Sequence, residues 1–426
     1  MPRPWLAGGL GAFAVYAALV AVISSDFVHQ TWGTIAAVGY GLAAVAALVP
    51  RSAAERILRW PAAGTDLAVA VAFCGGLAVP LGWLVARGLA QPEVLVIARS
   101  GAGLISRGMP YPSAGALAAT TDPNAYNPYL PAMSLFGLPR ALAGGPLTDP
   151  RIWFGLAFVI VFWLALRRAG AADPARWTVG VTGSPVIAFT LATGGDDAPM
   201  VAFLCLGFAC LWPPLGRSAR GRPALERSAL DRPALGRYGP VTAGLALGVA
   251  ASMKATAWPA IAVALALLAA VHGRRAAARF TVTALAVVAV IAGPFLARYP
   301  KALVENTIEF PLGLAHVVSA AASPLPGHLI AGTGPAGHTF VVVALVLAGL
   351  VVAISLLSFP PRTVPRAMGV LAGAMTLMFM LAPSTRYGYF IYPLTLVIWL
   401  LVAMAGRKGD NYSGPRVAKR APSRSG

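Results

Sequence analysis

The stretch PVTAGLALGVAASMKATAWPAIAVALALLAAV, residues 240–271, decides the fold of this chain. As a single helix its 32 residues would be ~48 Å long at 1.5 Å per residue, well beyond a bilayer core of about 30 Å. Basic segments flank both ends of the stretch, which places both ends on one side of a membrane. We therefore predict two shorter helices, broken between Ser252 and Pro259, that enter and leave on the same side.

Lys254 is expected at or near this break. A charge at that depth is tolerated when it faces a polar cavity or a partner of opposite charge. The alternative is a lysine whose side chain snorkels to the membrane interface. The sequence leaves both interpretations open.

The whole chain has the composition of a membrane protein. It is 58% hydrophobic and 11% charged, with a mean hydropathy of +0.73, which leaves too little polar surface for a soluble fold. The other apolar stretches of spanning length are 5–24, 31–49, 67–86, 152–166, 177–193, 198–213, 280–297, 338–358, 366–382 and 388–405. We predict an all-α polytopic membrane protein with about 10–12 transmembrane or re-entrant helices and a large outer loop between the third and fourth spans.

The charged residues are distributed unevenly between the two sides. With the N-terminus in the cytoplasm, the inner segments are Arg3, 50–65, 167–176, 214–238, 272–279, 359–366 and the tail. They hold 24 of the 33 Lys and Arg residues, whereas eight of the 14 carboxylates lie outside. The net charge of +19 thus predicts topology and contact with anionic membrane lipids, not nucleic-acid binding. We expect a multi-pass cell-membrane protein with both termini cytoplasmic and its active face outward.

The domain organisation is correspondingly simple. Residues 1–405 are expected to form one transmembrane domain, with outer loops at 87–151 and 298–337 and an Arg-rich cytoplasmic linker at 214–238. Residues 406–426 are expected to be a disordered basic tail. The three cysteines lie in apolar stretches, and the histidine spacing in the second loop matches no compact metal site, so no metal is predicted. Nothing in the sequence fixes the oligomeric state.

The large outer loop carries most of the candidate chemistry. Residues 91–112, QPEVLVIARSGAGLISRGMPYP, are expected to form an amphipathic helix at the interface that begins at Glu93 and ends at Gly108 and Pro110. Residues 120–142, TTDPNAYNPYLPAMSLFGLPRAL, combine turn formers with aromatic residues that predict a packed surface.

These segments resemble the GT-C membrane glycosyltransferases, in particular the family-87, polyprenol-phosphate-mannose-dependent type of actinobacteria. The resemblance rests on an acidic residue that opens an outer-face helix, a G-x-P-Y motif and the N-P-Y-L-P segment. Further matching pieces are TGGDDAPMVAFLCLGFA from Thr193, GVAASMKATAWP from Gly248 and PSTRYGYFIYPL from Pro383. The pieces are spread over about residues 88–400, and their order and common sidedness carry more weight than any one of them.

The resemblance implies an inverting enzyme that transfers a sugar, mannose in most of the family, from a polyprenyl-phosphate donor to a lipid or glycan acceptor on the non-cytoplasmic side. The donor is a co-substrate, and no cofactor is implied. Glu93 matches the family's general base, with Asp196 and Asp197 as the alternative base. Arg386 and Lys254 are the candidates for binding the donor phosphate. The candidates for sugar or acceptor contacts are Asp122, Tyr126, Tyr387 and His316.

Structural interpretations stand beside each of these roles. Glu93 fits a solvated charge at a helix N-terminus, and Asp196 with Asp197 fits a cap of the sixth span. Arg386 fits an interfacial anchor within an aromatic belt, and the loop tyrosines fit simple packing. Two other function classes also remain: a transporter or flippase with Lys254 in its pathway, and a non-catalytic membrane scaffold.

Overall fold

The computed structural model describes residues 3–50, 65–213 and 238–412. Within these ranges the chain is helical, with one isolated bridge, between Ala322 and Thr385, and no named strand. Nine segments of the described chain are long and apolar enough to cross a membrane. They are α1 (Arg3–Ile23), α2 (Phe27–Leu48), Leu67–Ala86 in α4 (Thr65–Phe73), η1 (Cys74–Ala78) and α5 (Val79–Ala86), α9 (Pro150–Ala169), Ala255–His272, α15 (Arg274–Arg298), α18 (Pro335–Ser358), α19 (Val364–Leu381) and Tyr387–Arg407 in η9 (Tyr387–Phe390) and α20 (Ile391–Tyr412). The prediction of an all-α, multi-pass membrane protein is confirmed.

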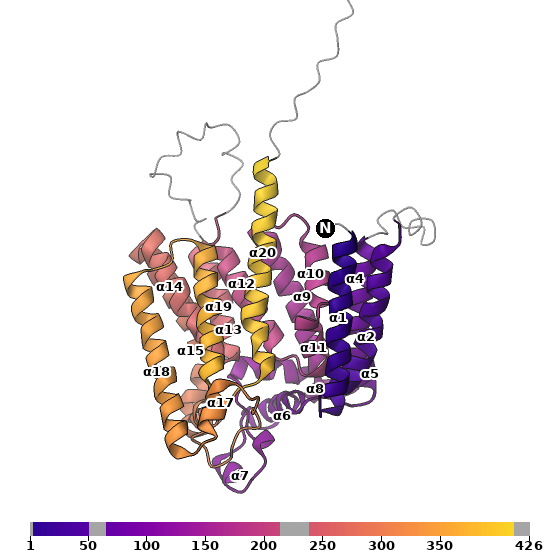
Figure 1. Ribbon diagram of the computed structural model, residues 1–426. Coiled ribbons are helices and arrows are strands. Elements are labelled where there is room, and N and C mark those ends of the chain that lie inside the picture. The colour runs from indigo at the N-terminus through magenta and orange to yellow at the C-terminus, as the bar shows by residue number, and fades with distance from the viewer. Residues whose placement is uncertain (1–2, 51–64, 214–237, 413–426) are drawn as a thin grey trace, which may run out of the picture.

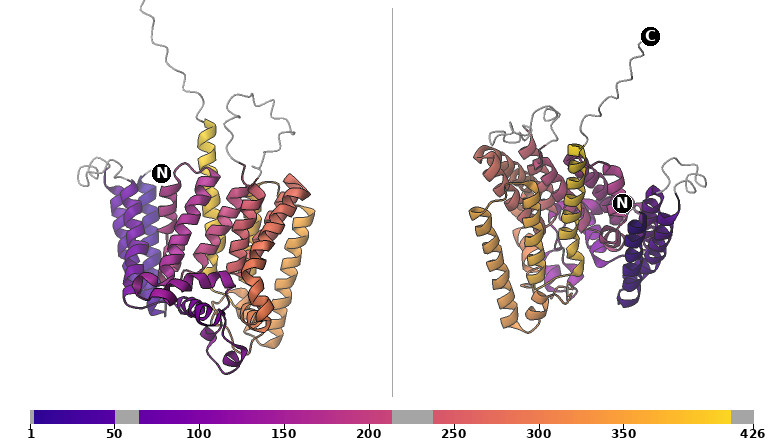
Figure 2. Two further views of the ribbon diagram at one scale, coloured as in Figure 1. Left: turned by 180° about the vertical axis from the view of Figure 1, so that it is seen from behind. Right: turned by 45° about the horizontal axis from the view of Figure 1, so that its top comes forward.

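The predicted break is present in the 240–271 stretch. Helix α13 (Gly239–Met253) ends before Lys254, and α14 (Trp258–His272) begins after the 3₁₀ turn η7 (Ala255–Ala257). The backbone of Lys254 is extended, with φ −147° and ψ 143°. Pro259 lies in the first turn of α14, where a residue without an amide proton costs no hydrogen bond. Both outer ends of the pair lie at the same face of the bundle (Figures 1 and 2).

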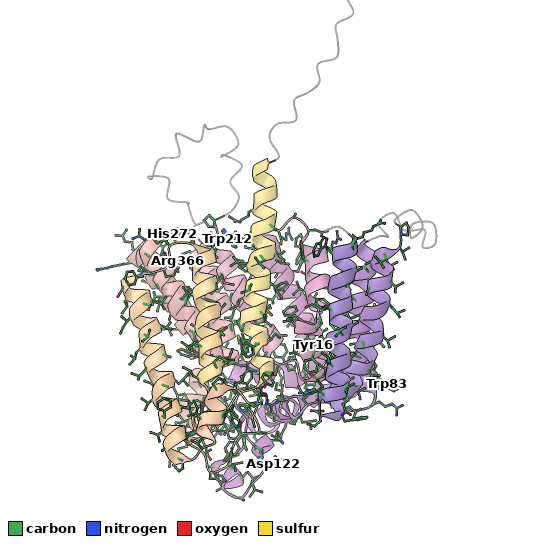
Figure 3. The ribbon with its side chains drawn as sticks, in the orientation of Figure 1. Tyr16, Trp83, Asp122, Trp212, His272 and Arg366 are labelled. Atoms are coloured by element: carbon green, nitrogen blue, oxygen red, sulfur yellow. The ribbon has the colours of Figure 1, made fainter. Side chains whose placement is uncertain are left out.

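The bundle has two distinct faces. The start of α1 and the end of α20 lie at the upper face in Figure 1, and Figure 3 places Trp212, His272 and Arg366 there too. The opposite face, called the loop face below, carries α6 (Pro92–Arg107), α7 (Ala114–Ala118), α8 (Leu138–Ala143) and α17 (Pro326–Ala331). The two large loops therefore lie together, as the charge pattern predicts.

Helix α6 begins one residue before the predicted start and ends where the amphipathic pattern predicts. Pro92 opens it with Glu93 in its first turn, and Gly108 ends it in the left-handed conformation at φ 65°. Gly101 allows α6 to lie directly on the 3₁₀ segment η3 (Pro131–Gly137), because a Cβ there would come within 2.3 Å of the Gly137 carbonyl carbon. The helix is thus fixed against the loop face, crosswise to the spans (Figure 1).

Arg151 ties the loop face to the spans. It is fully buried at the start of α9, and its guanidinium group donates to both carboxylate oxygens of Asp149 at 2.9 Å. It also donates to the carbonyls of Leu89, just before α6, and Ala192, in the last turn of α11 (Pro185–Thr193), at 2.8 Å each. This one side chain therefore sets the position of two segments that border the site described below.

We expect Arg151→Met to lower the free energy of unfolding by about 3–5 kcal/mol, because it leaves a largely buried carboxylate and two carbonyls without their cation. The thermal unfolding midpoint of the purified protein in neutral detergent would measure the loss. Arg140→Gln is the control, since Arg140 is exposed and, among the described residues, its side chain bonds only the Gly145 carbonyl of its own loop. An equal midpoint for Arg151→Met and wild type would contradict this role.

One expected boundary is wrong. Helix α20 continues through 406–412, which the sequence analysis assigned to a disordered tail. The polar residues there extend an already formed helix, because helix propagation costs less than nucleation. The rest of that tail lies outside the described residues, and so does the expected linker 214–238 except for its last residue.

Candidate functional site

A cavity of about 990 Å³ lies between the loop face and the spans. Its walls come from segments that are far apart in the chain: the second half of α1, the start of α2, the start of α6, 123–129, the junction of α11 with α12 (Asp197–Leu211), 254–256, 307–324 and 386–392. Figure 3 places one lining residue, Tyr16, between α1 and α20 at mid-height of the bundle. The site is thus set into the bundle on its loop-face side.

Lys254 forms the centre of a buried ionic cluster. Its Nζ lies 2.6 Å from the Oδ2 atom of Asp196 and also donates a hydrogen bond to Asp197. The Tyr392 hydroxyl donates to the same carboxylate oxygen of Asp197. The ring of Tyr129 lies under the ammonium group, 4.8 Å from Nζ to the ring centroid. Lys254 therefore faces a polar cavity and its partners, and does not snorkel to an interface.

The turn between α11 and α12 aims the two carboxylates at Lys254. Gly195 adopts the left-handed conformation at φ 81°, which a residue with a side chain adopts only with strain. Asp196 precedes α12, but its side chain accepts no capping hydrogen bond. The capping interpretation of this pair is therefore not what the structure shows.

The N-P-Y-L-P segment fixes the other side of the cluster. The amide of Leu130 donates to the carbonyl of Met253 at 2.9 Å, which satisfies one of the free carbonyls at the end of α13. Asn127 is buried and connects to the second loop, because its backbone amide donates to the Asn306 Oδ1 atom at 2.8 Å. The segment thus holds Tyr129 beneath Lys254.

Glu93 and Arg386 form a second ion pair in the same cavity. A parallel bridge holds the backbone before Arg386, with 2.9 Å bonds between Thr385 and the neighbours of Ala322. The Glu93 Oε1 atom accepts from Arg386, whereas its Oε2 atom is buried and has no hydrogen-bond partner in the described chain. Burial raises the pKa of Glu93 above the usual carboxyl range, and the nearby Arg386 partly offsets this rise.

The residues predicted for sugar or acceptor contacts divide into two groups. Tyr126 and Tyr387 line the cavity. Tyr126 is buried, stacks on Phe310 at 4.2 Å between ring centroids, and approaches the His316 Nδ1 atom at 3.2 Å. His316 itself does not line the cavity. Asp122 is exposed at the lower tip in Figure 3, and its carboxylate caps the turn at Asn124.

The structure adds lining residues that sequence reasoning did not assign to the site. Tyr129 lies in the N-P-Y-L-P segment, where the sequence favours packing, and Tyr392 lies in the aromatic belt beside Arg386. Gln91 and His29 also line the cavity, and their side chains contact each other at the junction of α1, α2 and α6. No local pattern marks His29, because its partner lies in a distant segment.

The cavity combines a buried carboxylate oxygen free to accept a proton with two cations able to bind an anion. Within the described ranges, no three His, Cys, Asp or Glu side chains come together as metal ligands would. His328 and His338 instead contact the carbonyls of Pro383 and Leu312.

No protein-family model, curated protein or solved structure matches this chain.

Proposed function

We propose that this protein is a GT-C-like membrane glycosyltransferase. It transfers a sugar, expected to be mannose, from a polyprenyl-phosphate donor to a hydroxyl of a lipid or glycan acceptor. One observation carries the proposal: a single cavity collects the free oxygen of Glu93, the cations of Arg386 and Lys254, and an apolar wall. This combination suits a reaction that needs a base, an anion site and a lipid-linked substrate.

The proposed step is a single inverting displacement. The acceptor hydroxyl gives its proton to Glu93 Oε2 as its oxygen bonds the anomeric carbon on one face. The bond from that carbon to the phosphate oxygen breaks on the opposite face, and the electron pair leaves with polyprenyl phosphate. The transition state has oxocarbenium character, and Arg386 and Lys254 stabilise the charge that develops on the leaving phosphate.

The ion pairs favour Glu93 over the Asp196 and Asp197 pair as the base. Both aspartates are engaged by Lys254, and Asp197 accepts a further hydrogen bond from Tyr392. Arg386 has one carboxylate partner, and its side chain is 30% exposed against 10% for Lys254. An incoming phosphate therefore reaches Arg386 first. It competes with Glu93 for the guanidinium group, and the weaker ion pair leaves Glu93 free to accept the proton.

The apolar wall supports a donor with a lipid chain. Tyr16, Leu19, Val20 and Ile23 of α1 line the cavity, and Leu19 and Ile23 are 52% and 75% exposed. Such side chains at membrane depth suit a hydrocarbon chain better than water. The positive-inside rule predicts that the loop face is outward, away from the cytoplasmic pool of soluble nucleotide sugars.

The direct test is transfer of radiolabel from polyprenyl-phosphate mannose to lipid and glycan acceptors in membranes that contain this protein. Wild-type membranes should transfer label, and membranes without the protein should not. Absence of transfer from donors of several sugars, across several acceptor lipids, would overturn the proposal.

The acid limb of the pH profile provides a second test. Transfer needs ionised Glu93, so kcat/KM should fall as pH falls through its pKa, which burial places above the usual carboxyl range. Arg386→Gln removes the charge that lowers this pKa, so we expect its acid limb at higher pH as well as a lower maximum. Arg140→Gln is the control, and an acid limb that stays in place in Arg386→Gln would contradict the assignment.

One observation favours a transporter or flippase as the second candidate. Helices α13 and α14 form a broken pair with a buried lysine at the break, as in proteins that bind solutes at discontinuous helices. Reconstituted liposomes would separate the two functions, because a flippase moves fluorescent polyprenyl-phosphate sugar across the bilayer without breaking its glycosyl bond.

A further inference from the structure

A second cavity, of about 230 Å³, lies beside α6 on the loop face. Its lining includes Val96, Arg99, Arg107, Pro110, Ser113 and Asn127. Val96 also lines the large cavity, so the two spaces are neighbours along the same helix. The small cavity has no part in the chemistry described so far.

Both arginines line this cavity and are also exposed to its outside. The Nη2 atom of Arg99 donates to the carbonyls of Asn124 and Ala125, at 2.5 and 3.3 Å. Arg107 folds back over its own helix, because a Cβ at Gly103 would lie 2.7 Å from its Nη2 atom. An arginine that only snorkelled to headgroups would extend away from the helix. The missing side chain at Gly103 gives the exposed Arg107 side chain the room to lie against α6.

The charge of this cavity is not balanced. In the part of the chain that the structure describes, the Arg107 side chain makes no hydrogen bond and no ion pair. Asp122 is the carboxylate whose charge interacts with Arg99. This carboxylate also accepts a hydrogen bond from the backbone amide of Asn124. Two guanidinium groups and one carboxylate thus leave a net positive pocket with free N–H donors.

We propose that the Arg99–Arg107 pocket binds an anionic group, a phosphate or carboxylate, of the acceptor. Guanidinium groups present planar pairs of donors that match the oxygens of such groups. The distance along α6 from Glu93 to Arg99 is ~9 Å at 1.5 Å per residue, so a bound acceptor can place a neighbouring hydroxyl at Glu93. The inference rests on the proposed function, and it names the substrate class as an anionic acceptor.

Binding is measured on the purified full chain in neutral detergent by isothermal titration calorimetry. The probes are short-chain phosphatidic acid, short-chain diacylglycerol with the same chains, and inorganic phosphate. We expect Arg99→Gln/Arg107→Gln to weaken phosphatidic acid binding about tenfold or more, and diacylglycerol binding not at all. If the double variant also binds inorganic phosphate about tenfold more weakly than wild type, the ligand is a free phosphate and not a lipid headgroup.

Arg140→Gln is the matched control, because Arg140 is an exposed arginine of the same loop that lines neither cavity. If the double variant does not fold, Arg107→Gln carries the test, since no hydrogen bond or ion pair within the described chain depends on the Arg107 side chain. Equal phosphatidic acid affinity in wild type and variant would overturn the inference.

Activity separates this inference from the proposed function. If transfer is found, the double variant should raise the KM for an anionic acceptor and leave the KM for the donor unchanged. Loss of phosphatidic acid binding without any transfer by wild type would support the pocket and count against the enzyme. Transfer with no change in acceptor KM or in binding would support the enzyme and refute the pocket.

Discussion

Glu93→Gln is expected to lower the rate of sugar transfer by about 10²–10⁴-fold, the usual contribution of a positioned general base. Glutamine keeps the size of the side chain and can still accept a hydrogen bond from Arg386, but its amide cannot take the acceptor proton. The affinity for donor should change much less than the rate. Radiolabel transfer from polyprenyl-phosphate mannose at matched protein levels measures both.

Two further variants make this result specific. Glu309→Gln changes another loop-face glutamate, one that does not line the cavity, and should retain transfer. Asp197→Asn tests the alternative base. If Asp197→Asn abolishes transfer in a protein of normal stability while Glu93→Gln remains active, the base belongs to the acidic pair. If neither substitution matters, neither Glu93 nor Asp197 is the base.

Lys254→Met is expected to lower the free energy of unfolding by about 3–5 kcal/mol and to abolish transfer. The substitution leaves Asp196 and Asp197 next to each other in a buried site without their cation. Their mutual repulsion and desolvation can be relieved only by protonation or by local opening. The thermal unfolding midpoint in neutral detergent measures the loss.

A compensating variant separates stability from function. Lys254→Met combined with Asp196→Asn and Asp197→Asn removes all three charges and should recover most of the stability, because neutral replacement of a buried ionic group is often tolerated. It should not recover transfer, since the phosphate-binding cation is still missing. Lys301→Met is the control, because Lys301 is an exposed lysine of the loop face. A Lys254→Met protein as stable as the control would contradict the ionic cluster.

The sequence did not predict that the α1–α2 hairpin lines the site. Its two helices were expected as spans, and both are long and apolar enough to cross a membrane. Their part in the site was not expected, because apolar residues such as Leu19 and Ile23 have the same pattern whether they face lipid or a cavity. His29 likewise could not be assigned to the site from sequence, because its side chain contacts Gln91, which lies 62 positions away.

The sequence by itself determined the membrane-spanning all-α fold, the break around Lys254, the bounds of α6 and the gathering of both large loops at one face. These features depend on hydropathy, charge and helix-ending residues, which act over a few turns of chain. Only the tertiary structure decided that Arg386 pairs with Glu93 across 293 positions, that Lys254 pairs with both aspartates, and that Asp122 lies outside the cavity. Such pairings depend on how the helices pack in three dimensions, and no local periodicity records which distant side chain a charge will meet.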